Sequence, residues 1–341
     1  MKPKTTRSRA TGRVTLADVA ALAKVSPITV SRALRGERAV ASDLSERVKA
    51  AAMKLGYTPD PAARALASRH SDHVAVLIPM LSNNLFVDVL ESIQKTLRQA
   101  GYQSLIGITH YDTREEEQLL REQLQHRPAG ILVTGLDRSE AARTLIEKSG
   151  IPCVHMMELS QSNAVHSVGF SQTQAAIALT DHLLQRGHQR IAFAAAQLDP
   201  RTMQRLDGWR KALKAAKCYD KALSYTNKSP SSMALGGDML EHIVTQDPSI
   251  DAIFFCNDDL AQGALLAAQR LKIKVPQQLA IAGFNDLTGS DLIGPGLTTI
   301  RTPRAAIGEA AAQMLLRLMR DEEVPMPSVD VGYELIVRGS T

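Results

Sequence analysis

The sequence predicts a two-part α/β protein, with an N-terminal all-α head that contains a helix-turn-helix and a two-lobed body of doubly wound parallel sheets. Two observations lead to this prediction. Within residues 1–70, apolar side chains recur at helical spacing in three short segments. From His73 onward, short apolar and β-branched runs alternate with amphipathic helical stretches in two successive series, which is typical of parallel strands covered by helices on both faces.

The first two helices of the head follow from their capping residues. Thr15 followed by Asp18 is a variant of the capping box and predicts a helix from about Leu16 to Ala23. Ser26 is a good N-cap, and Pro27 suits the first position of a helix because the N–H that proline lacks would be unpaired there. A second helix should therefore begin at Pro27. Two helices joined by so short a turn form a helix-turn-helix.

The rest of the head should add a third helix. The second helix should end near Gly36, and either Ile28 or Val30 is available to pack it against its neighbours. Ser42 should cap the third helix, whose apolar stripe ends at Gly56. We therefore expect a small three-helix unit.

Positive charge is concentrated in this head. The chain has a net charge of +5, but residues 1–70 hold 14 Lys and Arg against 5 Asp and Glu, whereas the remaining residues hold 26 against 30. A basic module on a slightly acidic body is typical of nucleic-acid binding. A three-helix bundle without a ligand is the alternative, and it does not explain the uneven charge. A solvated basic tail explains only residues 1–13, which we expect to be disordered.

Composition limits the remaining classes. A chain of 341 residues with 44% hydrophobic content is ordinary for a globular protein with two or three cores. The three cysteines, Cys153, Cys218 and Cys256, are too few and too scattered for a disulfide framework or a zinc site, so they indicate a reducing compartment. Neither a signal-peptide pattern nor an apolar run of membrane-spanning length is found, so we expect a cytoplasmic protein without a membrane partner.

The ends of the body's strands suggest a binding cleft rather than an active site. Ligands of open parallel sheets bind beyond the carboxyl ends of the strands, and several of these ends are polar and rich in asparagine, with Phe86 and Phe170 as stacking surfaces. The chain contains no nucleotide-binding glycine motif, no metalloprotease motif and no nucleophile elbow, so we expect no enzymatic activity, cofactor or metal. Asp258 and Asp259 could form an acid/base pair, but beside Asn257 at a strand end they are interpreted as a helix cap.

A resemblance makes the head more specific. The segment VTLADVAALAKVSPITVSRALRG, followed by SERVKAAAMKLGYTPDPAARALAS, resembles the DNA-binding head of the lactose and galactose repressor family. The resemblance implies a DNA-binding domain at 14–58. At 59–72 it implies a hinge helix that forms when two copies meet over the minor groove. Composition alone would make residues 59–72 a short amphipathic helix or a linker. It implies that Pro27, Ile28 and Arg32 face base edges. The implied DNA-contacting residues are Thr15, Ser26, Pro27, Ile28, Thr29, Ser31, Arg32, Arg35, Tyr57, Ala63, Arg64 and Leu66, the last as a wedge between base steps.

The resemblance extends over nearly the whole chain. It implies a periplasmic-binding-protein-like body at 73–341 that binds an effector and dimerises, with its lobes joined by three crossovers. The first lobe would cover about 73–170 and 300–327, and the second about 171–299 and 328–341. The implied effector pocket consists of Asn84, Phe86, Phe170, Arg205, Asn257 and Asn285. A homodimer on near-palindromic operator DNA is implied, and the tail lacks the heptad extension of a tetramer.

One departure from the family bears on the effector. The family's strand-end motif usually ends Gly-aromatic-Asp-Asp, whereas this chain has GFND, with Asn285 in place of the first Asp. Without that negative charge beside Arg205, the pocket favours an anionic effector, because a guanidinium pairs bidentately with a carboxylate. Several segments also resemble the gluconate-utilisation branch of the family. We therefore expect a repressor that responds to a sugar acid such as gluconate or ketogluconate. A neutral pentose or hexose is the alternative effector. A solute-binding protein and an enzyme of small sugar acids are remote alternatives.

Overall fold

The computed structural model describes residues 14–34, 40–58, 71–81 and 84–341. They belong to two units, one ending at Ser71 and the other beginning at Asp72. The expected tail at 1–13, the expected helix end near Gly36 and nearly all of the expected hinge helix lie outside the described residues.

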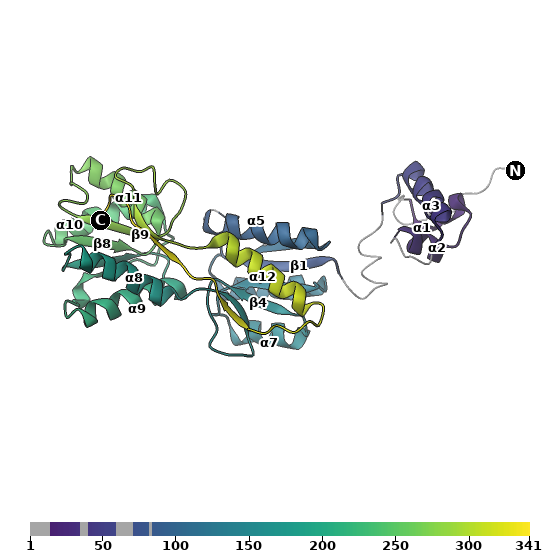
Figure 1. Cartoon of the computed structure of the whole chain (residues 1–341), viewed down its shortest axis with the longest axis horizontal. Coiled ribbons are helices and arrows are strands. Elements are labelled where there is room, and N and C mark those ends of the chain that lie inside the picture. The colour runs from purple at the N-terminus through teal and green to yellow at the C-terminus, as the bar shows by residue number, and fades with distance from the viewer. Residues whose placement is uncertain (1–13, 35–39, 59–70, 82–83) are drawn as a thin grey trace. The chain divides into compact units, whose positions relative to one another are not determined.

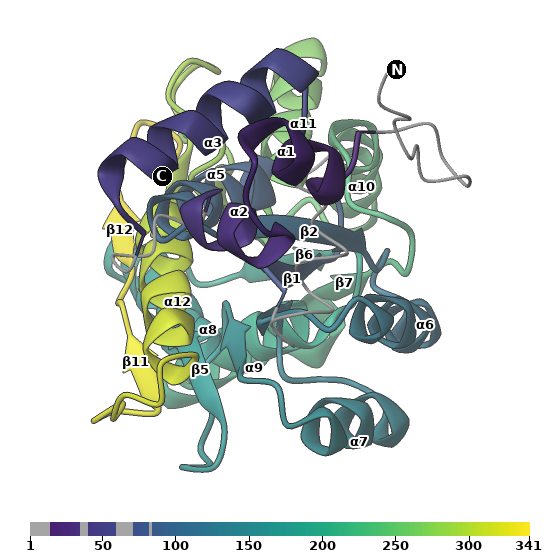
Figure 2. The same cartoon turned by 90° about the vertical axis from the view of Figure 1, so that its right-hand side faces the viewer.

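The head consists of α1 (Leu16–Ala23), α2 (Pro27–Leu34) and α3 (Ser42–Leu55), which pack on one another, as Figure 2 shows. Its core contains Val19 from α1, Val30 from α2 and Val48 from α3, each with no exposed surface. Val30, and not Ile28, therefore packs α2 against its neighbours. The expected three-helix unit is confirmed.

The caps of the head confirm two expectations and correct one. The capping box between Thr15 and Asp18 is present in both directions. The hydroxyl of Ser26 accepts a hydrogen bond of 3.1 Å from the backbone N–H of Thr29, as expected of an N-cap. The expectation that Ser42 caps α3 is wrong, because the carbonyl of Ala41 already accepts from the N–H of Ser45, so Ser42 is the first helical residue and its side chain makes no cap.

The first lobe of the body is a six-stranded sheet, counted over the described residues, in which every pairing is parallel. Side chains of β1 alternate between its two faces: Val74 and Val76 join one hydrophobic cluster, and Ala75 and Leu77 join the other. Helices α5 (Asn84–Gln99) and α12 (Arg304–Leu318) pack side by side on one face (Figure 1). Helices α6 (Thr113–Gln125) and α7 (Glu140–Ser149), both labelled in Figure 2, cover the other. In spatial order the strands are β11 (Ser328–Asp330), β5 (His166–Gly169), β4 (Cys153–Met156), β3 (Gly130–Thr134), β1 (His73–Ile78) and β2 (Gln103–Ile108).

The second lobe repeats this plan. Its strands, in spatial order, are β12 (Glu334–Ile336), β10 (Thr298–Arg301), β9 (Ala280–Asn285), β8 (Ala252–Phe255), β6 (Ile191–Ala195) and β7 (Ser224–Thr226), and β12 is antiparallel to β10. Helices α8 (Gln172–Gln185) and α9 (Pro200–Ala215) cover one face, and α10 (Met233–Gln246) and α11 (Asp258–Arg270) the other (Figure 1). A 3-10 turn, Lys221–Leu223, directly precedes β7.

The chain passes between the two sheets three times, after β5, after β10 and after β11. The expected lobe boundaries need two corrections. The segment Ser328–Asp330, which we had placed in the second lobe, pairs with β5 in the first sheet. Residues 300 and 301, which we had placed in the first lobe, pair with β9 in the second sheet. These strands are too short to carry a hydrophobic period, so only their pairing assigns them to a lobe.

Gly236 and Gly263 let α10 and α11 cross at backbone contact. A Cβ built on Gly263 would lie 1.8 Å from the carbonyl oxygen of Met233, whereas one built on Gly237 would meet only ordinary contacts of 3.5 Å or more. We predict that Gly263→Ala lowers the free energy of unfolding by about 2 kcal/mol because the helices must separate. Gly237→Ala is the matched control, and its better helix propensity should leave stability unchanged or raise it by up to about 1 kcal/mol. Urea unfolding measures both, and equal effects would contradict the prediction.

Candidate functional site

A cavity of about 400 Å³ lies between the two lobes, at the carboxyl ends of their strands. The first lobe contributes residues that follow β1, β2 and β3, and the second contributes residues that follow β6 and β7. This is the position at which open parallel sheets bind ligands, and the volume lies within the usual range of small-molecule sites, roughly 300–1,000 Å³. The lining residues are Pro79, Thr109, Tyr111, Asp112, Thr113, Glu116, Thr134, Asp137, Gln197, Leu198, Asp199, Pro200, Arg201 and Lys228.

Arg201 is the buried cation of this cavity and stands in the first turn of α9. The carboxylate of Asp199 caps that helix by accepting from the backbone N–H of Arg201 at 2.9 Å and of Thr202 at 3.2 Å. The Nε atom of Arg201 lies 3.5 Å from the same carboxylate, and the residue is 5% exposed. Burial alone would lower the pKa of Arg201, but Asp199, Glu158 and other acidic neighbours outweigh it and raise the pKa, so the guanidinium stays charged.

Tyr111 and Asp137 face this cation from the first lobe. The ring centroid of Tyr111 lies 5.8 Å from the Cζ atom of Arg201, and burial raises the pKa of the phenol to about 12. His110 and Tyr111 have φ angles of 47° and 61°, in the left-handed region that non-glycine residues seldom adopt. Burial also raises the pKa of Asp137, while Arg201 acts to lower it. The tyrosine is thus a neutral donor beside a permanent positive charge.

The carboxylate of Glu116 at the cavity wall is already neutralised. It accepts a 2.7 Å bond from the Nε atom of Arg138, which is buried and also donates to the carbonyls of Thr134 and Gly135. The same guanidinium contacts His155, and burial together with Arg138 lowers the pKa of His155 to about 4. The imidazole is therefore neutral at physiological pH.

Four of the six residues expected in the effector pocket meet beside the lobe connections. The Arg205 guanidinium donates to Gln172 at 2.9 Å, to the carbonyl of Cys256 at 2.7 Å and to Asn257 at 2.8 Å. It also lies 3.9 Å from the ring centroid of Phe284, on which Phe170 stacks. The carboxamide of Asn257 accepts a further bond of 3.1 Å from Asn285.

None of the six expected residues lines the 400 Å³ cavity. Phe86 is buried in the hydrophobic core, and Asn84 is the exposed first residue of α5. Sequence reasoning missed Tyr111, Asp137 and Arg201. Their signal in the sequence is a polar segment directly after a strand: THYD for Tyr111, TGLD for Asp137 and QLDPR for Arg201.

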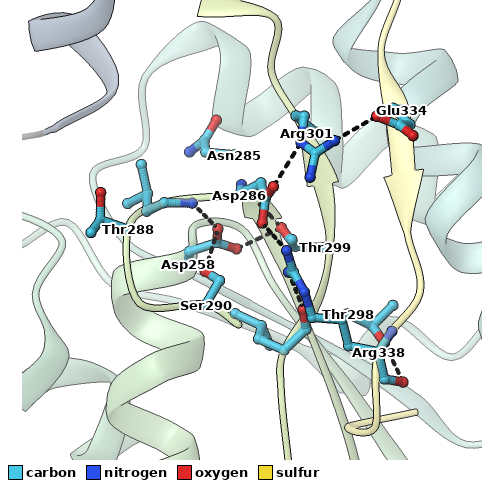
Figure 3. Close-up of polar contacts among 12 residues, drawn as sticks. Asp258, Asn285, Asp286, Thr288, Ser290, Thr298, Thr299, Arg301, Glu334 and Arg338 are labelled. Atoms are coloured by element: carbon cyan, nitrogen blue, oxygen red, sulfur yellow. Dashed lines mark hydrogen bonds and ion pairs between the residues drawn. The ribbon is translucent and has the colours of Figure 1, made fainter. Parts of the chain in front are cut away.

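Asp258 is not the helix cap that the sequence suggested. Asn257 occupies the N-cap position of α11. The Asp258 carboxylate instead accepts from the N–H of Leu287 at 2.7 Å, from Ser290 at 3.1 Å and from Thr299 at 2.7 Å, and Figure 3 shows it pointing toward these groups. Burial raises its pKa from 3.8 to about 6. The role of Asp258 is to hold the segment after β9 against β10.

A second set of ion pairs joins the segments that connect the lobes. The Asp286 carboxylate binds Arg301 and Arg338, each at 2.8 Å, and Arg301 binds Glu334 at 2.8 Å (Figure 3). Arg304, at the start of the first-lobe helix α12, donates to the carbonyls of Asn285 at 2.6 Å and Asp286 at 3.2 Å in the second lobe. The end of β9 is thus tied to two of the three connections between the lobes.

The outward face of α2 is the candidate DNA-contacting surface of the head. Ser26, Pro27 and Arg32 are exposed, and Ile28 is 66% exposed, while Val30 and Ala33 point inward. The hydroxyls of Ser26 and Thr29 lie 2.8 Å apart. Ser31 is half-buried on this helix, Thr15 belongs to the capping box of α1, and Tyr57 packs against the core of the head. Arg35, Ala63, Arg64 and Leu66 lie outside the described residues.

These features define a class of protein: a DNA-binding regulator with a helix-turn-helix head and a two-lobed ligand-binding body. Residues 15–60 match the family model for bacterial regulatory proteins of the lacI family, and residues 180–341 match the periplasmic binding protein-like domain. The chain is 52% identical to the HTH-type transcriptional regulator GntR of Pseudomonas aeruginosa over 334 residues, which cover 98% of this chain and 97% of that protein. It is 34% identical to the regulator of the same name in Escherichia coli, over 96% of this chain and 98% of that one. The chain belongs to the LacI family of transcriptional regulators.

Solved structures agree with this assignment. The crystal structure of the transcription regulator GntR from Chromobacterium violaceum superimposes with a TM-score of 0.77 at 49% identity, over 79% of this chain and 98% of that one. A LacI family regulator from Silicibacter pomeroyi superimposes with a TM-score of 0.88 at 32% identity, over 96% of this chain and 99% of that one. Among the helices that the structure describes, none combines the length and the apolarity needed to cross a bilayer.

Proposed function

We propose that the chain is a dimeric, cytoplasmic, non-enzymatic repressor whose affinity for operator DNA is controlled by a sugar acid such as gluconate or ketogluconate. The observation that carries the proposal is the cavity between the lobes, which is lined by polar side chains of both lobes. A ligand that contacts both walls favours the closed arrangement, since only there does it make all of its contacts. Effector binding therefore changes how the lobes are disposed.

The connections between the lobes would carry this change toward the DNA. Arg304 and the ion pairs of Asp286 couple β9 of the second lobe to α12 of the first. In a dimer, a change in the relative arrangement of the lobes would change the spacing of the two heads. These heads occupy successive major grooves of a near-palindromic operator. Such coupling between distant sites typically amounts to about 1–3 kcal/mol. We also propose that Ala63, Arg64 and Leu66 contact the operator DNA, with Leu66 as the wedge between base steps.

The cavity's chemistry can hold both ends of a sugar acid. Its walls carry two cations, Arg201 and Lys228, that can pair with a carboxylate, and four carboxylates and three threonine hydroxyls that can bond sugar hydroxyls. The relatives named GntR support the same branch of the family. A regulator that responds to a neutral pentose or hexose is the second candidate, because the acids Asp137 and Asp199 would also accept hydroxyl protons.

Calorimetry tests the effector class. We predict that the full chain binds gluconate or 2-ketogluconate with a dissociation constant at least tenfold lower than that for glucose or a pentose, a difference of about 1.4 kcal/mol. The same acids should change the affinity of the chain for its operator in a gel-shift or fluorescence assay. Binding of only neutral sugars would reject the sugar acid and favour the second candidate.

A further inference from the structure

We propose that Arg201, and not Arg205, is the side chain that binds the carboxylate of the effector; this inference rests on the proposed function. The observation that carries it is a buried cation whose hydrogen-bonding groups are unused. Arg201 is 5% exposed and lines the cavity, yet its two Nη atoms form no hydrogen bond with any residue in the described parts of the chain. Within the described ranges its side chain makes one close polar contact, from Nε to the Asp199 carboxylate at 3.5 Å.

Arg205, one turn further along α9, has the opposite environment. Its Nε atom and one Nη atom donate three hydrogen bonds of 2.7–2.9 Å to uncharged oxygens of Gln172, Cys256 and Asn257. The face of its guanidinium is covered by Phe284. A ligand carboxylate would have to displace these partners to reach it. Arg205 therefore holds α9 against the ends of β8 and β9, and Arg201 is the arginine that binds the carboxylate of the effector.

The carboxylates around Arg201 do not satisfy its guanidinium. Asp199 is engaged in capping α9, and the two oxygens of Glu158 accept from Gln204 at 2.6 Å and from the N–H of Leu136 at 3.2 Å. They hold the guanidinium charged while leaving its two Nη atoms without a hydrogen bond. A planar carboxylate fits such a pair of Nη donors with two parallel bonds.

The same arrangement orients the rest of the effector. With the carboxylate at Arg201, the hydroxyl-bearing chain of a sugar acid extends across the cavity toward Asp137, Thr109 and Thr134 of the first lobe. Arg201 belongs to the second lobe, so one effector molecule joins an acid-binding wall to a hydroxyl-binding wall. A neutral sugar fills the hydroxyl side only, which explains how the cavity would distinguish the two classes.

The competing interpretation makes Arg201 a structural counter-ion of Asp199, Glu158 and Asp137. The two interpretations differ in what Arg201→Gln does to ligands of different charge. An anchor for a carboxylate affects gluconate and leaves glucitol, its uncharged polyol counterpart, almost unchanged. A structural counter-ion affects both ligands equally, because its loss disturbs the whole cavity.

The experiment is calorimetry on the full chain with gluconate and glucitol, with thermal unfolding of each unliganded variant as a folding check. We expect Arg201→Gln to weaken gluconate binding about a hundredfold, which equals about 2.7 kcal/mol, and to change glucitol binding less than threefold. Arg201→Lys keeps the charge but loses the paired geometry, so it should bind gluconate about tenfold more tightly than Arg201→Gln does. It also keeps the test valid if the glutamine variant misfolds. The matched control is Arg210→Gln, an exposed arginine of the same helix paired with Asp207, which should bind both ligands as the wild type does.

The outcomes separate this inference from the proposed function. If the wild-type chain binds no sugar acid, the proposed effector is wrong and the role of Arg201 fails with it. If the wild type binds gluconate and Arg201→Gln binds it equally well, the proposed function stands and the role of Arg201 is rejected. If both Arg201 variants lose affinity equally for gluconate and for glucitol, Arg201 is a structural counter-ion and its role as the carboxylate anchor is also rejected.

Discussion

Asp258→Ala is expected to lower the free energy of unfolding by about 4 kcal/mol, since it leaves three buried donors without their acceptor. The donors are the N–H of Leu287 and the hydroxyls of Ser290 and Thr299. Ser290 has little freedom to find another acceptor, because its hydroxyl oxygen already accepts from Gln262 at 3.1 Å. The loss should be read from urea unfolding at neutral pH, and a loss below about 1 kcal/mol would show that water replaces the carboxylate.

Asp258→Asn is the matched variant, and its effect should depend on pH. Because burial raises the pKa of Asp258 from 3.8 to about 6, the folded chain binds a proton at this group more tightly than the unfolded chain does. The stability that this proton contributes is fully present below about pH 4 and is lost as the pH rises through about 6. The asparagine variant lacks this dependence, so its stability relative to the wild type should rise by about 2 kcal/mol between pH 4 and pH 7. A constant difference would contradict the raised pKa.

Local signals predicted local structure well in this chain. The capping box of Thr15 and Asp18 and the N-cap at Ser26 depend on residues within one turn, so the sequence contains everything that decides them. The alternation of strands and helices in the body was predicted for the same reason, since strands such as β1, β3, β6 and β9 are nearly continuous buried runs.

Features that depend on distant partners were predicted poorly. Asp258 follows an asparagine at a helix start, a pattern typical of a cap, but its partners lie 29 to 41 positions further along the chain. The segment Ser328–Asp330 was assigned to the wrong lobe because its partner strand is some 160 positions earlier in the chain. Arg201 and Arg205 are chemically identical and stand one helical turn apart, so only the packing of the lobes decides which of them faces the cavity.

The outward face of α2 leads to the last prediction, which concerns DNA. Ile28 and Arg32 are four residues apart and therefore share one side of the helix, opposite the buried Val30 and Ala33. Ile28 is 66% exposed at the start of this helix, and we expect its apolar surface to contact a thymine methyl. The arginine beside it suits the two acceptors of a guanine edge.

We therefore predict that Arg32→Ala weakens operator binding by about a hundredfold and removes the preference for guanine at one position of each half-site. Ile28→Ala should instead remove a preference for thymine at an adjacent position, with a smaller loss of affinity. Binding-site selection from a randomised DNA library by the full chain measures both changes. Arg47→Ala, which removes an exposed cation of α3, is the control and should leave the selected sequence unaltered. If all three variants select the same sequence as the wild type and differ only in affinity, α2 binds phosphates, and the bases are read by another part of the chain.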